Sequence, residues 1–339
     1  MLNPDAKLAK NIFDTPDQAP TRDGLGKGLL ELGETNPNVV AVCADLAEST
    51  RILPFKEKYP DRYIEVGVAE QNLATIASGL ANYGKIPFIA SYATFSPGRN
   101  NEQIRTTISI NNVPVKIAGS HAGLSVGPDG ATHQALEDIG LMRMQPRMSV
   151  LSPCDAQEAR KATLAAAAHP GPVYLRFARE KTPVMTTPET PFEFGKAQVM
   201  WQQQDRRKNP DVAIFATGPL LYNALLAARE LEGEVSVVVV NIHTIKPLDA
   251  AAVVQLAKKA GAVVTVEEHQ VAGGLGSAIA EVLSAQCPVP IEFVGVHDQF
   301  GQSGTPEELI RHYHMDAKSI VDSVRRAAGR KVTAKAGSR

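Results

Sequence analysis

Glu70, Asp129 and His133 are side chains whose type and setting in this sequence favour chemistry. Glu70 follows a short apolar strand and opens an alanine-rich helix, so close packing can bury it. Burial raises the pKa of a carboxyl group, and the protonated form can share a proton with a ligand nitrogen. Asp129 and His133 lie in the glycine-rich loop 127–134. Polar groups on a loop above a rigid sheet can recognise hydroxyl groups.

These positions also have ordinary structural interpretations. Glu70 could be an acidic residue in the first turn of a helix, where the helix dipole favours it. Phe95 could be a core aromatic near a strand end, and His133 could cap a helix. Asp45, which ends the first expected strand, could cap a segment near Ser49. The carboxyl end of a strand is also where doubly wound sheets place groups that face a ligand.

Three segments favour the chemical interpretation. They are Arg62-Tyr63-Ile64-Glu65-Val66-Gly67-Val68-Ala69-Glu70-Gln71-Asn72, Ala90-Ser91-Tyr92-Ala93-Thr94-Phe95 and Gly127-Pro128-Asp129-Gly130-Ala131-Thr132-His133-Gln134. In this order and spacing they resemble the pyrimidine-binding domain of the thiamine-diphosphate enzymes of the transketolase group. Such enzymes also need a diphosphate-binding domain, marked by Gly-Asp-Gly with asparagine further along, and this sequence has no such segment. The chain therefore resembles half of an enzyme.

Two segments of the second half extend the resemblance. They are Thr244-Ile245-Lys246-Pro247-Leu248-Asp249 and Val266-Glu267-Glu268-His269-Gln270-Val271-Ala272-Gly273-Gly274-Leu275-Gly276-Ser277. Both resemble the C-terminal domain shared by transketolases, deoxyxylulose-phosphate synthases and the β subunits of 2-oxo-acid dehydrogenases. The resemblance covers residues 20 to 320.

The resemblance implies thiamine diphosphate as the cofactor. Glu70 would be catalytic, because a carboxyl group at the pyrimidine ring lets the cofactor's own amino group act as a base. Phe95 would stack on the aminopyrimidine, Tyr92 would line the pocket, and Asp45 would lie beside the thiazolium ring. The Mg²⁺ ligands are expected on a partner chain, so no metal ligand is assigned here.

A substrate site is implied as well. Asp129 and His133 would contact the hydroxyls of the donor ketose, and His133 would also be catalytic. The residues that match phosphate-binding positions are Arg22, Ser49, His121 and Arg179. Guanidinium, imidazole and hydroxyl groups are suitable donors for a phosphate dianion. Arg176 competes with Arg179 for this assignment.

The implied function is that of one subunit of a transketolase, a transferase that moves a two-carbon ketol unit from a ketose phosphate to an aldose or aldose phosphate. Activity would need a separate diphosphate-binding subunit, in an α2β2 heterotetramer, and pentose phosphates or less common ketose phosphates would be the substrates. Three alternatives stay open. A deoxyxylulose-phosphate synthase usually carries arginine where His121 stands. A 2-oxo-acid dehydrogenase β subunit lacks the Asp-Gly-x-Thr-His-Gln loop. A non-enzyme regulatory subunit would need a broken site.

Two alternating series of strands and helices must position these residues. Continuous apolar runs of four to eight residues indicate parallel strands buried on both faces. The expected strands are 39–44, 63–66, 86–90, 113–118, 149–151, 173–177, 212–216, 235–241, 262–266 and 291–294, and the expected helices are 71–83, 102–110, 156–168, 220–230, 250–259 and 275–285. We therefore expect an α/β chain with two domains, each a mostly parallel β-sheet flanked by helices.

The expected boundaries follow changes in composition. They are an N-terminal extension at 1–19, a pyrimidine-binding domain at 20–182, a linker at 183–210, a C-terminal-like domain at 211–328 and a disordered tail at 329–339. The linker is rich in proline and carries the charged run Asp205-Arg206-Arg207-Lys208, which suits a surface crossing. The tail is polar and basic.

Composition indicates a soluble globular protein, with 339 residues, 44% hydrophobic and 21% charged. A formal net charge of −1 gives no reason to expect a nucleic-acid or membrane partner. No apolar run reaches the roughly 18 residues of a spanning helix, and the N-terminus lacks a signal-peptide pattern. Cys43, Cys154 and Cys287 are widely separated, which fits neither a disulfide framework nor a zinc site. Buried thiols in a reducing cytoplasm are expected.

Overall fold

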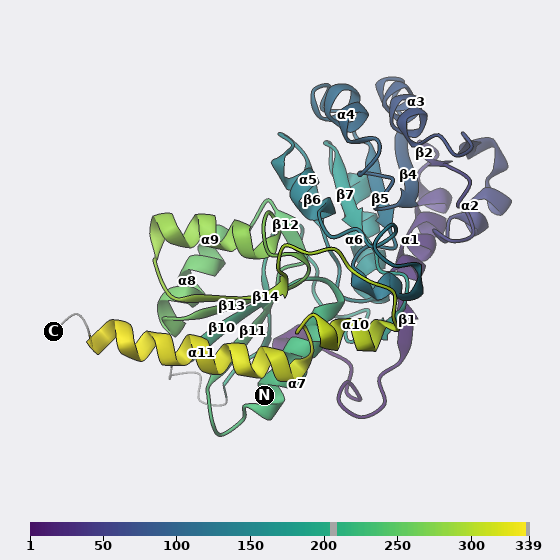
Figure 1. Cartoon of the computed structure of the whole chain (residues 1–339). Helices are drawn as coiled ribbons and strands as arrows, with labels where there is room; N and C mark the ends of the chain where they lie inside the picture. Colours follow the sequence, from purple (N-terminus) through teal and green to yellow (C-terminus); the bar gives the residue numbers. More distant parts are fainter. Residues whose placement is uncertain (204–208, 337–339) are drawn as a thin grey trace.

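The computed structural model describes residues 1–203 and 209–336 and contains two α/β domains (Figure 1). The sheet of the first domain has the strand order β12-β6-β7-β5-β4-β2-β3. Its strands are β2 (Val39–Cys43), β3 (Tyr63–Glu65), β4 (Ile86–Tyr92), β5 (Lys116–Ser120), β6 (Ser149–Leu151), β7 (Val173–Arg176) and β12 (Thr244–Lys246). The pairs are parallel except β12 with β6. Parallel pairing places the carboxyl ends of β2, β4, β5 and β7 at one edge of the sheet.

Helices cover both faces of this sheet. They are α1 (Thr21–Thr35), α2 (Leu53–Lys58), α3 (Glu70–Asn82), α4 (Asn101–Gln103), the π-helical turn η3 (Ile104–Ser109), the 3₁₀ turn η4 (Leu124–Asp129), α5 (Asp138–Met144) and α6 (Ala156–Ala168). α1 and α6 pack on one face, and α3 and α5 pack on the other. Gly24 lets α1 approach α6 closely, since a Cβ there would collide with the Ala156 carbonyl.

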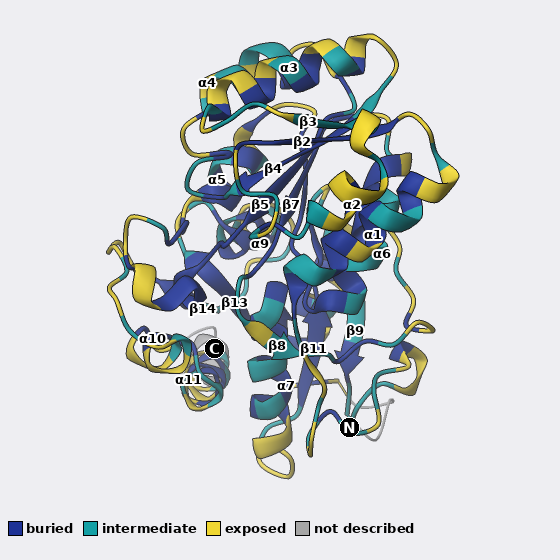
Figure 2. Ribbon diagram, turned by 90° about the vertical axis from the view of Figure 1, so that its right-hand side faces the viewer, coloured by how far each residue is buried: buried dark blue, intermediate teal, exposed yellow. Residues whose placement is uncertain are grey.

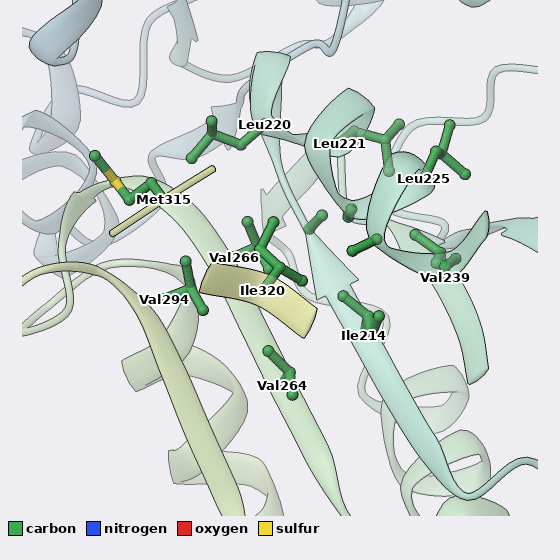
Figure 3. Packing of buried hydrophobic residues seen from close by; sticks show 14 of the residues in the cluster. Ile214, Leu220, Leu221, Leu225, Val239, Val264, Val266, Val294, Met315 and Ile320 are labelled. Atoms are coloured by element: carbon green, nitrogen blue, oxygen red, sulfur yellow. The ribbon is translucent and has the colours of Figure 1, made fainter. Parts of the chain in front are cut away.

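The second sheet has the order β14-β13-β10-β11-β9. Its strands are β9 (Gln198–Trp201), β10 (Val212–Ala216), β11 (Val237–Asn241), β13 (Val263–Gln270) and β14 (Ile291–Val296), all parallel except β9. Its helices are α7 (Leu221–Glu230), α8 (Ala250–Ala260), α9 (Leu275–Gln286), α10 (Pro306–His312) and α11 (Ala317–Ala336). Figure 3 shows Ile320 of α11 packed against Val264 and Val266 of β13. The predicted fold class, two mostly parallel sheets flanked by helices, is confirmed.

The predicted linker and tail differ from the structure. Residues 198–201 of the linker form β9, and Leu2 of the N-terminal extension forms a bridge with Trp201. Ala6 and Ile12 are buried in the core of the second domain, so both segments pack with that domain. The charged run at 205–208 lies outside the described residues. The tail prediction is wrong up to residue 336, because α11 continues past Gly329, and residues 337–339 are not described.

A strand pair and a helix cap are among the contacts that join the domains. β12 belongs by sequence to the second domain but pairs with β6 at the edge of the first sheet. Asp155 caps α6 by accepting from the Glu158 N–H at 2.8 Å, and it also accepts from the N–H groups of Met185 and Thr186. Figure 2 shows both sheets buried, while exposed residues gather on outer helices such as α3 and α4. A separate two-stranded antiparallel sheet pairs β1 (Gln18–Pro20) with β8 (Lys181–Pro183).

Candidate functional site

Glu70 is the buried carboxylate of the site. It is the first residue of α3, and only 2% of it is exposed. Gly67, with a φ of 69°, turns the chain from β3 into this helix. The side chain of Asn100 donates to the Glu70 carbonyl at 2.9 Å, and Arg99 donates from Nη1 to the Glu70 carboxylate at 2.8 Å. The carboxylate lines a pocket of about 590 Å³ shared with Val68 and Arg99.

Aromatic and imidazole rings gather at the carboxyl ends of β4 and β5. Tyr92 lies at the end of β4 and stacks on His121, which follows β5, with ring centres 3.8 Å apart. Phe95 stacks on Tyr92 at 6.0 Å and meets the ring of His133 edge-on at 5.5 Å. Four of the predicted site residues therefore form one cluster, which we call the ring cluster: Tyr92, Phe95, His121 and His133.

A cationic group adjoins the ring cluster. Arg22 of α1 donates from Nη1 to the Ser49 carbonyl at 2.6 Å, and the same atom lies 3.3 Å from Nε2 of His121. A guanidinium can only donate, so Nε2 of His121 accepts. Burial, together with the charges of Arg22 and Arg179, lowers the pKa of His121 to about 3. His121 is therefore a neutral imidazole near pH 7.

The two competing arginines differ in their surroundings. Arg176, at the end of β7, is 5% exposed and forms an ion pair with Asp138 at 2.8 Å. It also donates to the carbonyls of Ala135 and Glu268, so its guanidinium is committed to buried partners. Arg179 donates to the Val126 carbonyl at 2.9 Å, and a third of its side chain remains exposed. Of these two, Arg179 is the one with a side chain that can meet a ligand.

Asp45 and Asp129 are both exposed, and neither side chain is tied to the ring cluster by a hydrogen bond or ring contact in the described part of the chain. The backbone of Asp45 is fixed, because its N–H donates to Glu65 at 2.8 Å. Glu65 also accepts from the Gly67 N–H and the Tyr63 hydroxyl. Asp129 ends η4, in the loop that leads to His133.

Sequence reasoning missed several residues around the site. Arg99 and Asn100 contact Glu70, and Glu65 holds the backbone of Asp45. The polar run 98–103, directly after Phe95, was a visible signal for the first two. Glu268 lies in a motif that was recognised, but nothing in the sequence indicates its contact with Ser125, which comes from the other domain.

Among residues 1–203 and 209–336, no three His, Cys, Asp or Glu side chains gather as a metal site would need. Within the same ranges, no helix combines the length and apolar character needed to cross a membrane.

Residues 17–185 match the family model described as transketolase, pyrimidine binding domain, and residues 202–320 match transketolase, C-terminal domain. The chain is 40% identical over 304 residues to the 6-deoxy-6-sulfo-D-fructose transketolase subunit SqwH of Clostridium sp. (strain MSTE9), covering 89% of this chain and 92% of that protein. It is 38% identical over 316 residues to a 1-deoxy-D-xylulose-5-phosphate synthase of Leptothrix cholodnii, covering 92% of this chain and 48% of the synthase.

A solved structure described as a split gene transketolase, inactive β4 tetramer, is similar over nearly its whole length. It is 43% identical with a TM-score of 0.85, and the match covers 92% of this chain and 99% of that one.

Proposed function

This chain belongs to the transketolase family and carries that family's pyrimidine-binding and C-terminal domains, and from this premise we propose that it is one subunit of a thiamine-diphosphate-dependent transketolase. The enzyme transfers a two-carbon ketol unit from a ketose phosphate, such as a pentose phosphate, to an aldose or aldose phosphate. It is active only with a separate diphosphate-binding subunit.

The observation that carries this proposal is that Glu70, the ring cluster and two arginines gather at one edge of a parallel sheet. The two arginines are Arg22 and Arg179. A buried carboxylate and a nearby aromatic ring suit an aminopyrimidine, which needs a hydrogen-bonding partner for its ring nitrogen and an apolar face to stack on. Arg22 and Arg179 suit the phosphate end of a sugar.

The residues present fit the proposed cofactor. Glu70 would bond the pyrimidine nitrogen, Phe95 would stack on the ring, and Tyr92 would line the pocket. Asp45, at the carboxyl end of β2, would lie toward the thiazolium ring. When bound, thiamine diphosphate supplies the nucleophilic carbon that accepts the two-carbon unit. Glu70 holds the proton at the pyrimidine nitrogen that this activation needs.

Two groups of residues would bind the substrate, one at its phosphate and one near its reacting carbon. Arg22, Ser49, His121 and Arg179 would hold the phosphate, and Asp129 and His133 would contact hydroxyls near the reacting carbon. Because His121 is neutral, it would lie beside the phosphate without adding charge to the site. His133 would also move a proton at a substrate hydroxyl, since an imidazole has one nitrogen that can donate and one that can accept.

A partner subunit completes the site in this proposal. The pocket beside Glu70 is open to solvent, and Val68 on its rim is 72% exposed. Tyr83 and Ile110, which follow the packed helices α3 and η3, are 90% and 55% exposed. In this proposal the partner would cover these exposed apolar side chains. The partner would supply the diphosphate site and the Mg²⁺ ligands, in an α2β2 heterotetramer.

The alternatives differ in their predicted substrates. A deoxyxylulose-phosphate synthase is favoured by the likeness to the Leptothrix protein, but His121 stands where that family usually carries arginine. The site residues are present, which disfavours a purely regulatory subunit.

We place the enzyme in the cytoplasm because Cys43, Cys154 and Cys287 are free thiols.

The test is reconstitution with a candidate diphosphate-binding subunit. The isolated chain should neither bind thiamine diphosphate tightly nor turn over a ketose phosphate, and the mixture should transfer a ketol unit to an aldose phosphate. Calorimetry that gave micromolar cofactor binding to the isolated chain, or full activity without a partner, would refute the split arrangement. Pyruvate consumption with no ketol transfer would instead identify a synthase.

A further inference from the structure

The loop that carries Asp129 and His133 is held by the second domain. We call residues 123–135 the substrate loop. The loop closes on itself, because the Gly123 N–H donates to the Ala135 carbonyl at 2.9 Å. Leu124 is buried in the core of the second domain, and Gln134 donates to the Gln302 carbonyl at 3.1 Å.

Glu268 makes a charged contact with this loop. It comes from β13 of the second domain and is 3% exposed. Its Oε1 accepts from the Ser125 N–H at 2.5 Å. The carboxylate lies so close to the loop that a Cβ on Gly123 would collide with it, and Gly123 also has a φ of 91°. Glycine is the residue that tolerates both conditions.

The position of Glu268 is itself fixed from the first domain. Its carbonyl accepts from Arg176 Nη2 at 2.9 Å, and Arg176 is held by the buried pair with Asp138. The backbone of Glu268 is therefore anchored to the first domain, and its side chain reaches the loop. Hydrogen bonds to ionised acceptors are stronger than neutral ones, so this contact is suited to fixing a loop.

We propose that Glu268 is a positioning residue of the second domain, which fixes the substrate loop through the Ser125 N–H and so orients Asp129 and His133. The inference rests on the proposed function, because it deepens the role of the same site. Recognition groups must be held within a fraction of an ångström of their working geometry, and loop residues need support to achieve that.

The kinetic test uses the full chain assembled with its diphosphate-binding partner. Glu268→Ala should lower kcat/KM for the ketose donor by roughly 10-fold or more, the scale for losing a charged acceptor of a buried N–H. Glu268→Gln should recover most of this loss, since its amide oxygen still accepts from Ser125. Hydrogen–deuterium exchange at C2 of the cofactor should stay unchanged in both, because Glu70 and Phe95 are untouched.

Glu267→Gln is the matched control. Glu267 is the adjacent residue of β13 and is equally buried, but it accepts from the N–H groups of Leu275 and Gly276 at the start of α9. The control should keep the donor kinetics of the wild type. If it reproduced the Glu268→Ala defect, the effect would be one of general stability and the proposal would be overturned.

A double-mutant cycle adds a stricter criterion. If Glu268 acts through Asp129, the loss in Glu268→Ala combined with Asp129→Ala should be smaller than the product of the single losses. Independent, multiplicative losses would contradict the proposal. Should Glu268→Ala not assemble, Ser125→Pro removes the same hydrogen bond from the loop side, and proline is tolerated in a first helical turn.

A readout without catalysis separates this proposal from the proposed function. Amide hydrogen exchange of peptides from the substrate loop should be faster in Glu268→Ala than in wild type or Glu267→Gln. An assembly that never transfers a ketol unit would refute the proposed function, and the exchange rates would still decide the positioning role. Unchanged exchange in Glu268→Ala would overturn it.

Discussion

Arg99 donates a hydrogen bond from Nη1 to Oε2 of Glu70 across 2.8 Å, and about half of its own side chain is exposed. Its guanidinium carbon also lies 4.9 Å from the centre of the Phe95 ring. One side chain therefore makes the two contacts that the proposal assigns to the aminopyrimidine. A ring that stacks on Phe95 and bonds to Glu70 has to move this guanidinium. Because Glu70 is only 2% exposed, the ring nitrogen that displaces Arg99 would have to take over the hydrogen bond to its carboxyl group.

Glu70→Gln should slow hydrogen–deuterium exchange at C2 of the bound cofactor by at least ~10²-fold, the usual scale for a positioned acid–base group. The amide keeps the shape of the side chain but cannot exchange a proton with the pyrimidine nitrogen. Proton NMR of the assembled enzyme measures the exchange. Arg99→Gln is the control, and it should keep the exchange rate close to that of wild type because the bound ring has already displaced this guanidinium from Glu70. Near-normal exchange in Glu70→Gln would end this assignment.

Arg179→Ala should raise KM for a phosphorylated acceptor by roughly 10-fold, the lower end of the range for losing a charge-assisted contact at a partly exposed site. Glycolaldehyde has no phosphate, so its KM should hardly change. Steady-state kinetics with both acceptors separates the two effects. Arg325→Ala removes an arginine that pairs with Glu234 on the second domain and should leave both values alone. Equal weakening of both acceptors in Arg179→Ala would remove Arg179 from the phosphate site.

Arg176→Ala should lower the free energy of unfolding. The substitution leaves the carboxylate of Asp138, which is 1% exposed, without its cation. Removing one partner of a buried ion pair costs about 3–5 kcal/mol of unfolding free energy. Urea unfolding of the isolated chain measures this loss. Arg179→Ala should unfold within about 1 kcal/mol of wild type, because the ion pair of Arg179 with Glu180, 3.4 Å apart, is partly exposed. A wild-type unfolding curve for Arg176→Ala would contradict the structural role.

His243 should make the chain sensitive to acid. Its ring is buried and stacks on Phe192 with centres 4.3 Å apart, and burial lowers its pKa from 6.5 to about 4. The unfolded chain then takes up this proton before the folded chain does. The stability from the neutral ring is thus fully present above pH 6.5 and is lost as pH falls toward 4.

The shift corresponds to about 3 kcal/mol, at 1.36 kcal/mol per pKa unit. Urea unfolding at several pH values should show that His243→Gln loses less stability than wild type between pH 6.5 and 4. If the unfolding free energies of the two proteins fell equally with pH, His243 would not titrate in this range.

The sequence predicted the parts of the fold that depend on local pattern. The strand at 149–151 and the helix at 156–168 match β6 and α6, because apolar runs and an N-cap at Asp155 are local signals. Glu70 was expected to follow a short strand and Phe95 to lie near a strand end, and in the structure they follow β3 and β4. Tyr92, Phe95, His121 and His133 were predicted as site residues from the family resemblance, and their contact with one another is a finding of the structure.

The missed features depend on contacts between distant parts of the chain. Glu268 meets Ser125 across 143 positions, and Leu2 meets Trp201, so no window of sequence contains either contact. The choice between Arg176 and Arg179 also needed the structure, since both are arginines near one strand end and only burial separates them. Arg99 was missed because an arginine in a polar run is usually a solvated side chain.

The pairing of β12 with β6 makes it costly to divide the two domains between separate chains. Cutting the gene between residues 183 and 210 would give a leading fragment whose sheet ends at β6 with its hydrogen-bonding groups bare, a template for aggregation. The trailing fragment would lose Ala6 and Ile12, which fill its core from the far end of the chain. Each domain therefore depends on the other, one for a covered sheet edge and one for a filled core.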